Sequence, residues 1–325
     1  MSEKLTSPIL VITDHTGSDS EGYTLTEPSK RLLTMARALT SGGVWAIALN
    51  PAPDVAALST YGATRILSPK MGRFSPRIPA VVADCVVAAV NHDAPGAILG
   101  VSNARGRDVA AQVAVLLGSG ASVEVSRLEV CDGELVSHKS VLGGTWETQF
   151  HMTRGIPVVA ARTSGLEATR IEAAEVEVET YPVSFRASTK AITVMSSREV
   201  GGTVSLADAP VVVCGGRGVA GDFSLVNELA NELGGAVGAT RVATEEGWID
   251  RSAQVGQSGV SIAPNLYIGL GISGDIHHVS GIRGAKTIVA VCDDSEAPIF
   301  ELADFGVVGD LTTVVPQALK HLREQ

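Results

Sequence analysis

The chain has 325 residues, which suffices for one large domain or two ordinary ones. It is 45% hydrophobic and 18% charged, with 35 glycines and only 4% aromatic residues, which is typical of a globular α/β protein with many tight turns. A net charge of −10 argues against nucleic acid as a partner, because phosphate binding depends on clustered Lys and Arg.

The N-terminus lacks the basic and apolar segments of a signal peptide, and no apolar run approaches the roughly 20 residues that span a bilayer. The four cysteines, Cys85, Cys131, Cys214 and Cys292, are scattered and form no CxxC pair. They are expected to be reduced thiols rather than disulfides or metal ligands. We therefore expect a cytoplasmic protein of bacterial type that is not embedded in a membrane and holds no metal.

Strands and helices are expected to alternate through the first 120 residues. The apolar pattern predicts strands at 9–12, 44–49 and 97–101, and helices through 32–39, from Pro79 through Ala89, and over 108–117. This βαβ order predicts a parallel sheet. Between about residues 120 and 193 the pattern becomes rich in strands, at 123–130, 158–161 and 176–180, so we expect extra strands there.

One loop of this half, residues 102–108, carries Arg105 and Arg107 between a strand and a helix. It is either an anion site or a structural turn with solvated or paired arginines. The polar, glycine-containing stretch 195–202 predicts the domain boundary. We expect an N-terminal α/β domain with extra strands over residues 1–200 and a second domain over residues 201–325.

The second half repeats the alternation more strictly. Strands are expected at 211–214, 236–239, 266–270 and 287–291, with a helix capped by Asp222, further helices starting near Gly274 and around 299–303, and a final helix that ends near His321. Glycine-rich clusters at 254–259 and 271–274 flank the strand at 266–270. Loops at the carboxyl ends of parallel strands bind nucleotides, but neither GxGxxG nor a P-loop is present here.

Several motifs of this half occur together in a specific order: GGRG at 215–218, VGATR at 237–241, QVGQSG at 254–259, APNLYI at 263–268, GISG at 271–274, APIF at 297–300 and ADFG at 303–306. In order and spacing this set resembles the α subunit of electron-transfer flavoprotein. The resemblance covers nearly all of residues 210–316. The first half matches more loosely, through its first strand and the turn at 106–108.

The resemblance implies that the C-terminal domain is a doubly wound parallel sheet that holds FAD. The N-terminal domain is then expected to bind no cofactor and to pack against a β subunit, which commonly carries AMP, in an αβ heterodimer. The implied function is an electron carrier, rather than an enzyme with its own substrate chemistry. It would accept electrons from acyl-CoA or related flavoprotein dehydrogenases of fatty acid oxidation and pass them to a membrane quinone oxidoreductase.

The resemblance also implies site residues. The FAD-binding positions are Arg217, Thr240, Arg241, Val255, Gly256, Gln257, Ser258, Ser273, Gly274, Asp275, Ile276, His277, His278, Cys292, Asp310 and Leu311. Arg241 is expected over the isoalloxazine ring, Ser258 at its N5, and His278 at its O2, with a histidinium there favouring negative charge on the ring. No residue is expected to be catalytic in the usual sense; these three are expected to tune the flavin.

Three positions depart from the family pattern. The family usually has a small residue at position 275, Gln at 277 and Asn at 292, whereas this chain has Asp275, His277 and Cys292. Asp275 favours the dipole of a following helix but would oppose an adjacent pyrophosphate. Cys292 cannot replace the paired donor and acceptor of an Asn, which puts the adenine contact in doubt. Adjacent histidines point about 100° apart on a helix, which disfavours a shared metal.

Other functions stay open at this point. An NAD-dependent dehydrogenase would need the missing GxGxxG fingerprint. A regulatory adenine-nucleotide-binding protein would keep the glycines but would need neither Arg241 nor His278. A bifurcating flavoprotein, in which the β subunit carries a second FAD, has the same α-subunit motifs. The sequence identifies neither the dehydrogenases nor the acceptor, the flavin potentials, or whether the α subunit is stable alone.

Overall fold

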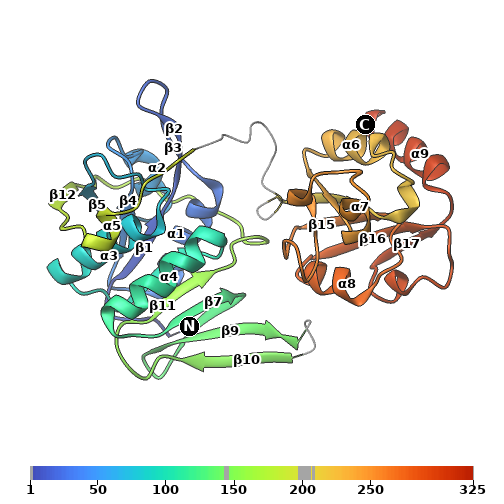
Figure 1. Ribbon diagram of the computed structural model, residues 1–325. Helices are drawn as coiled ribbons and strands as arrows, with labels where there is room; N and C mark the ends of the chain where they lie inside the picture. The colour runs from blue at the N-terminus through green and yellow to red at the C-terminus, as the bar shows by residue number, and fades with distance from the viewer. Residues whose placement is uncertain (1–2, 143–145, 197–205, 207–208, 325) are drawn as a thin grey trace. The chain divides into compact units, whose positions relative to one another are not determined.

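The computed structural model describes residues 3–142, 146–196, 206 and 209–324 and divides the chain into two compact units (Figure 1). The first unit comprises residues 1–140 and 147–197, and the second comprises residues 198–325 with 141–146. Both units are α/β, as the sequence predicts. The expected boundary after residue 200 lies outside the described residues. No helix of the described residues is long and apolar enough to cross a membrane.

A seven-stranded parallel sheet forms the centre of the first unit, in the order β12-β5-β4-β1-β6-β11-β7. Its strands are β1 (Ile9–Thr13), β4 (Val44–Ala48), β5 (Arg65–Lys70), β6 (Ala97–Val101), β7 (Ala121–Val125), β11 (Val158–Ala161) and β12 (Val178–Pro182). Its helices are α1 (Glu27–Leu39), α2 (Val55–Thr60), α3 (Pro79–His92), α4 (Ala104–Leu117) and α5 (Ala187–Lys190).

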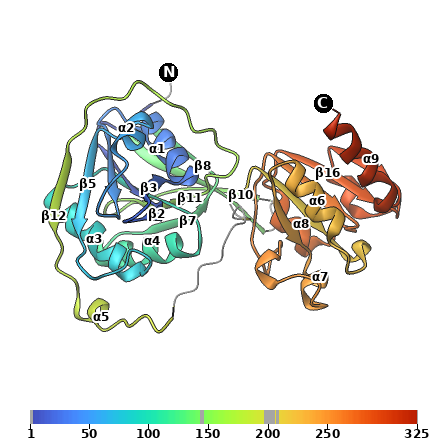
Figure 2. The same ribbon diagram turned by 90° about the horizontal axis from the view of Figure 1, so that it is seen from above.

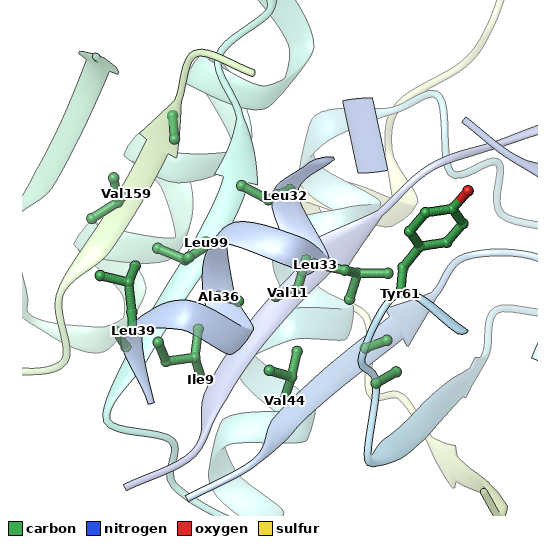
Figure 3. Close-up of a cluster of buried hydrophobic side chains, with 14 of the residues drawn as sticks. Ile9, Val11, Leu32, Leu33, Ala36, Leu39, Val44, Tyr61, Leu99 and Val159 are labelled. Carbon is green, nitrogen blue, oxygen red and sulfur yellow. The ribbon is translucent and has the colours of Figure 1, made fainter. Parts of the chain in front are cut away.

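Helices cover both faces of this sheet. Figure 2 shows α1 and α2 on one side and α3 and α4 on the other. Successive residues of β1 point to opposite faces, so Ile9 and Val11 pack with Leu32 of α1 (Figure 3), while Leu10 packs with Val82 of α3. Because both faces of the strand are buried, it appears in the sequence as a continuous apolar run rather than as an alternating one.

The strand-rich segment after residue 120 is present, as expected. In addition to β7, β11 and β12 it contains an antiparallel sheet of β8 (Arg127–Cys131), β9 (Glu134–Val141) and β10 (Trp146–His151). A short hairpin of β2 (His15–Ser18) and β3 (Gly22–Leu25) completes the unit. The sequence did not predict this hairpin.

The loop at 102–108 is a structural turn with paired arginines. Asn103 caps α4, and its Oδ1 accepts from the Gly106 amide at 2.8 Å, so the helix begins at Ala104 and not at the predicted residue 108. Arg105 pairs with Asp14. Arg107 pairs with Glu124 at 2.6 Å. The two guanidinium groups are therefore already paired with carboxylates and are not free to bind an anion.

The second unit is a five-stranded parallel sheet in the order β14-β13-β15-β16-β17. Its strands are β13 (Val211–Gly215), β14 (Ala236–Ala239), β15 (Leu266–Leu270), β16 (Thr287–Cys292) and β17 (Phe305–Val308). Its helices are η2 (Arg217–Val219), α6 (Ser224–Glu232), α7 (Arg241–Glu245), η3 (Arg251–Ala253), α8 (Ile276–Ile282), η4 (Pro298–Glu301) and α9 (Leu311–Arg323). The helix expected around 299–303 is the short 3₁₀ turn η4.

Figure 1 shows α6 and α9 on one face of this sheet and α8 on the other. Val226 of α6 and Leu319 of α9 belong to one core cluster, whereas Ile282 of α8 belongs to the other. From β13 the chain moves to β14 on one side of the sheet, and then to β15 on the opposite side. The order of strands therefore reverses between β13 and β15, which is where open α/β sheets form a ligand crevice at the carboxyl ends of the strands.

Candidate functional site

A cavity of about 410 Å³ lies at this reversal point in the second unit. Its wall contains residues that follow four of the strands, together with the loop at 254–258 and the start of α8. The lining residues are Arg217, Gly218, Thr240, Arg241, Val242, Gln254, Val255, Gly256, Gln257, Ser258, Gly271, Ile272, Ser273, Asp275, His277, His278, Cys292, Asp293 and Asp294. The volume is in the range of small-molecule and cofactor sites.

The glycine turns after β13 and β15 pack backbone against backbone at the floor of the cavity. The Gly216 amide donates to the Leu270 carbonyl at 2.9 Å, and the Gly218 amide donates to the Gly271 carbonyl at 3.0 Å. A Cβ atom at Gly218 would lie 2.7 Å from Gly271 Cα, so this crossing admits no side chain. Gly271 itself has a φ of +61°, which glycine adopts without strain.

The loop at 254–258 is held between β14 and α8. The Val255 amide donates to the Ala239 carbonyl at 2.9 Å, and the Gln257 amide donates to the His277 carbonyl at 2.8 Å. Gly256 has a φ of +137°, and a Cβ atom there would lie 2.8 Å from the His277 carbonyl oxygen. These contacts hold the loop against α8, and so they hold Ser258 at the wall of the cavity.

Two arginines present guanidinium groups to the cavity. Arg217 and Arg241 are both exposed, and the ion pair of Arg241 with Glu245 is long, at 3.6 Å from Nε to Oε1. Arg217 has no ion pair with any part of the chain that the structure describes. Guanidinium groups with this freedom suit phosphate oxygens or the face of an aromatic ring.

The hydroxyl of Thr240 is buried in the wall and has no hydrogen-bond partner among the described residues. An unpaired buried hydroxyl costs about 1–3 kcal/mol unless a ligand or a water satisfies it. With the two arginines and the volume of the cavity, this orphaned group fits a polar cofactor that carries phosphate.

His278 is buried, and both of its ring nitrogens have protein partners. Its Nδ1 lies 3.1 Å from the Val255 carbonyl oxygen, and its Nε2 lies 2.7 Å from the Tyr267 hydroxyl. A carbonyl only accepts, so Nδ1 carries the proton and Nε2 accepts from Tyr267. Burial lowers the pKa of His278 to about 4, although the Val255 carbonyl and the Asp275 charge oppose the shift. Only 5% of the residue is exposed, and burial disfavours the charged ring.

The three residues that depart from the family pattern each have a defined position in the structure. Asp275 caps α8, because its Oδ1 accepts from the His277 amide at 2.9 Å, so its charge faces the helix amides. His277 is exposed, and its Nδ1 contacts the Gln257 side-chain oxygen. Cys292 is buried at the end of β16 and lines the cavity. Within the described residues no group of three or more His, Cys, Asp or Glu could hold a metal.

Four expected positions do not line the cavity: Gly274, Ile276, Asp310 and Leu311. Gly274 fits against the backbone of Ile299, where a Cβ atom would lie 2.4 Å from the amide nitrogen. Asp310 caps α9 by accepting from the Thr312 amide and hydroxyl, each at 2.7 Å, and these bonds lower the pKa of its carboxyl. Direct FAD contact by these four residues remains a prediction.

Sequence reasoning missed two acidic lining residues, Asp293 and Asp294, directly after β16. The sequence could have indicated them, because they directly follow the predicted strand at 287–291, just as Arg217 follows β13. It also omitted Gln254 from the site residues, although the glycine cluster at 254–259 begins with it.

Comparison with known proteins identifies the family of this chain. A family model described as "Electron transfer flavoprotein domain" matches residues 15–185, and "Electron transfer flavoprotein FAD-binding domain" matches residues 205–283. The electron transfer flavoprotein subunit alpha of Mycobacterium leprae is 40% identical over 314 residues, which cover 95% of this chain and 96% of the relative. The chain belongs to the electron transfer flavoprotein α-subunit family.

Other members of the family are similar to this chain over different lengths. The α subunit of Mycobacterium tuberculosis is 36% identical over 97% of this chain and 98% of its own length. The mitochondrial α subunit of Oryza sativa is 50% identical over 122 residues, which cover 37% of this chain and 34% of the relative. FAD is accordingly the cofactor of this flavoprotein α subunit, and the second unit is the one whose match carries the FAD-binding description.

Proposed function

We propose that this chain is the redox subunit of a heterodimeric electron carrier. It would accept electrons from acyl-CoA or related flavoprotein dehydrogenases of fatty acid oxidation and pass them to a membrane quinone oxidoreductase. The observation that carries the proposal is the position of the cavity: it lies in the unit that matches the FAD-binding model, at the strand reversal where such sheets bind nucleotides.

FAD, when bound, supplies the reversible uptake of electrons, and the residues of the wall bind it and set its electrostatic surroundings. Arg217 and Arg241 would hold its phosphates and ring, since both residues are exposed, Arg241 has only a long ion pair, and Arg217 has none within the described residues. The unpaired hydroxyl of Thr240 would gain a partner. Ser258 would direct its hydroxyl at the ring from the loop that α8 holds in place.

Arg241 is the principal charge near the ring in this proposal. A fixed positive charge stabilises the negative charge that reduction adds, and so raises the potential of the flavin. His278 would contribute as a neutral, hydrogen-bonded ring, because burial keeps its pKa near 4.

The geometry of the cavity supports a carrier rather than an enzyme with its own substrate. Ser258 is hydrogen-bonded to the neutral amide of Gln254, at 2.8 Å, and not to a histidine or carboxylate that could act as a base. His278 has both nitrogens engaged by other protein groups. Neither residue is arranged for nucleophilic chemistry.

The first unit would pack against a β subunit that carries AMP, and the αβ pair would work in the cytoplasm. Support for the compartment comes from the four free cysteines, three of which are buried. Burial raises the pKa of Cys85 and Cys214 to about 12, so these thiols are unreactive.

The test is to co-express the chain with its β partner, count flavin per pair, and add an acyl-CoA dehydrogenase with its substrate. One FAD per pair that is bleached only when dehydrogenase and substrate are both present supports the proposal. Transfer onward is measured with a quinone oxidoreductase in vesicles. Two FADs per pair would assign the bifurcating class instead, and adenine nucleotide without flavin would refute the redox function.

A further inference from the structure

A buried glutamine connects the loop that carries Ser258 to the helix that carries Arg241. Gln254 is only 2% exposed, and both ends of its side-chain amide are engaged. Its Nε2 donates to Ser258 Oγ at 2.8 Å. Its Oε1 lies 3.1 Å from Thr244 Oγ1, whose one hydrogen is shared between this oxygen and the Arg241 carbonyl at 2.9 Å. Thr244 lies in α7, three residues after Arg241.

The backbone of Gln254 is fixed as firmly as its side chain. Its amide donates to the Arg251 carbonyl at 3.1 Å, and its carbonyl accepts from the Val260 amide at 2.8 Å. A bridge pairs Gln254 with Ala239 at the end of β14. Because neither backbone nor side chain can shift easily, the amide holds the Ser258 oxygen at a set position.

The direction of the second hydrogen bond determines what Ser258 can do. A serine hydroxyl has one hydrogen and can accept through its lone pairs. Since Ser258 Oγ accepts from Gln254, its own hydrogen is not used by that contact. Ser258 is exposed and lines the cavity, so the hydrogen is available to a group bound there.

We propose that Gln254 is a positioning residue that makes Ser258 a hydrogen-bond donor to the flavin. This inference rests on the proposed placement of FAD in the cavity. The oxidised isoalloxazine ring presents mainly acceptor atoms, and reduction changes their charge and protonation. A donor in a fixed direction therefore affects the oxidised and reduced rings differently and contributes to the potential. Through Thr244, the same amide keeps the Ser258 loop in register with the Arg241 helix.

The first variant is Gln254→Glu, studied in the αβ complex at about pH 8. A carboxylate only accepts, so the Ser258 hydroxyl must donate to it, which turns the Ser258 hydrogen away from the cavity, while Thr244 keeps its bond to the Arg241 carbonyl. Gln254→Met is the second variant, because it keeps the volume, removes both bonds and adds no buried charge. Gln317→Glu, on an exposed face of α9, controls only for the change in net charge, so the comparison of Gln254→Met with Ser258→Ala carries the result. Ser258→Ala removes the donor itself.

The measurements are the FAD dissociation constant, the oxidised absorption spectrum and the midpoint potential. We expect both Gln254 variants to weaken FAD binding about 2- to 10-fold, the value of one net hydrogen bond, and to shift the potential in the same direction as Ser258→Ala. A shift in Ser258→Ala with none in the Gln254 variants would overturn the positioning role and leave the carrier function standing. No shift in Ser258→Ala would overturn both this inference and the place of Ser258 beside the ring. Electron transfer from the dehydrogenase is a separate readout, so failure of the carrier function is distinguished from either result.

Discussion

The neutral, buried state of His278 predicts a specific dependence of stability on pH. The pKa of the ring is about 4 in the folded chain, against 6.5 for a solvated histidine. Because the folded value is the lower one, the unfolded chain binds the extra proton more readily. The stabilisation from the neutral ring is therefore fully present above about pH 6.5 and is lost as the pH falls toward 4.

The magnitude follows from the two pKa values. A difference of about 2.5 pH units corresponds to roughly 3 kcal/mol once both states are protonated. Between about pH 7.5 and pH 5 the loss is about 2 kcal/mol. The ring is almost completely buried, so solvent screening reduces these values little.

The assay compares His278→Gln with the unmodified chain, both in the αβ complex. Glutamine does not titrate, and its side-chain oxygen can still accept from Tyr267. Urea unfolding at the two pH values should show the unmodified protein losing about 2 kcal/mol more than the variant. The buried His15, whose pKa burial also lowers, contributes equally to both and cancels in the difference. Equal losses in the two proteins, or a His278 resonance that titrates near pH 6.5, would refute the reasoning.

Three further substitutions test the site and the fold. Arg241→Ala should lower the flavin potential, which potentiometry measures. It should change the free energy of unfolding by less than about 0.5 kcal/mol in urea unfolding, because the ion pair of Arg241 is long and exposed. Gly218→Ala should cost about 2 kcal/mol and reduce FAD retention, because its Cβ would lie 2.7 Å from Gly271 Cα; unfolding midpoints and bound flavin test it. Asp84→Ala should destabilise the first unit by about 2–4 kcal/mol, because it removes the buried carboxylate that pairs with Arg186; limited proteolysis of that unit reports the loss.

Each of these has a matched control. Arg241→Lys keeps the charge and should keep most of the potential. Gly234→Ala also places a side chain on a glycine turn, but nothing lies within 4 Å of its Cβ position, so it should cost only about 1 kcal/mol for its φ of +61°. Asp84→Asn keeps an acceptor and should lose less than alanine. An unchanged flavin potential in Arg241→Ala would contradict the first prediction. The second fails if Gly218→Ala is as stable as Gly234→Ala, and the third fails if Asp84→Ala leaves the first unit as resistant to proteolysis as before.

The sequence by itself predicted most strands and longer helices of the two parallel sheets, though not the β2–β3 hairpin, and its motifs implied most of the cavity wall. The apolar runs at 9–12 and 266–270 are strands buried on both faces, and that burial is what excludes polar residues from them. Glycines such as Gly218 and Gly271 appear where two turns cross in contact. Because parallel strands end at the same edge, residues that follow separate strands converge, and most of the residues that the family resemblance implied line one cavity.

Only the tertiary structure decided which partner each polar group has. The sequence does not show the environment of His278, whereas in the fold burial of the ring lowers its pKa to about 4. Asp310 caps a helix instead of lining the cavity. Gln254 meets Thr244 and Ser258 only because the loop folds back onto α7. Periodicity and glycine placement are properties of neighbouring residues, whereas hydrogen-bond partners and pKa values depend on groups that the fold brings together from distant parts of the chain.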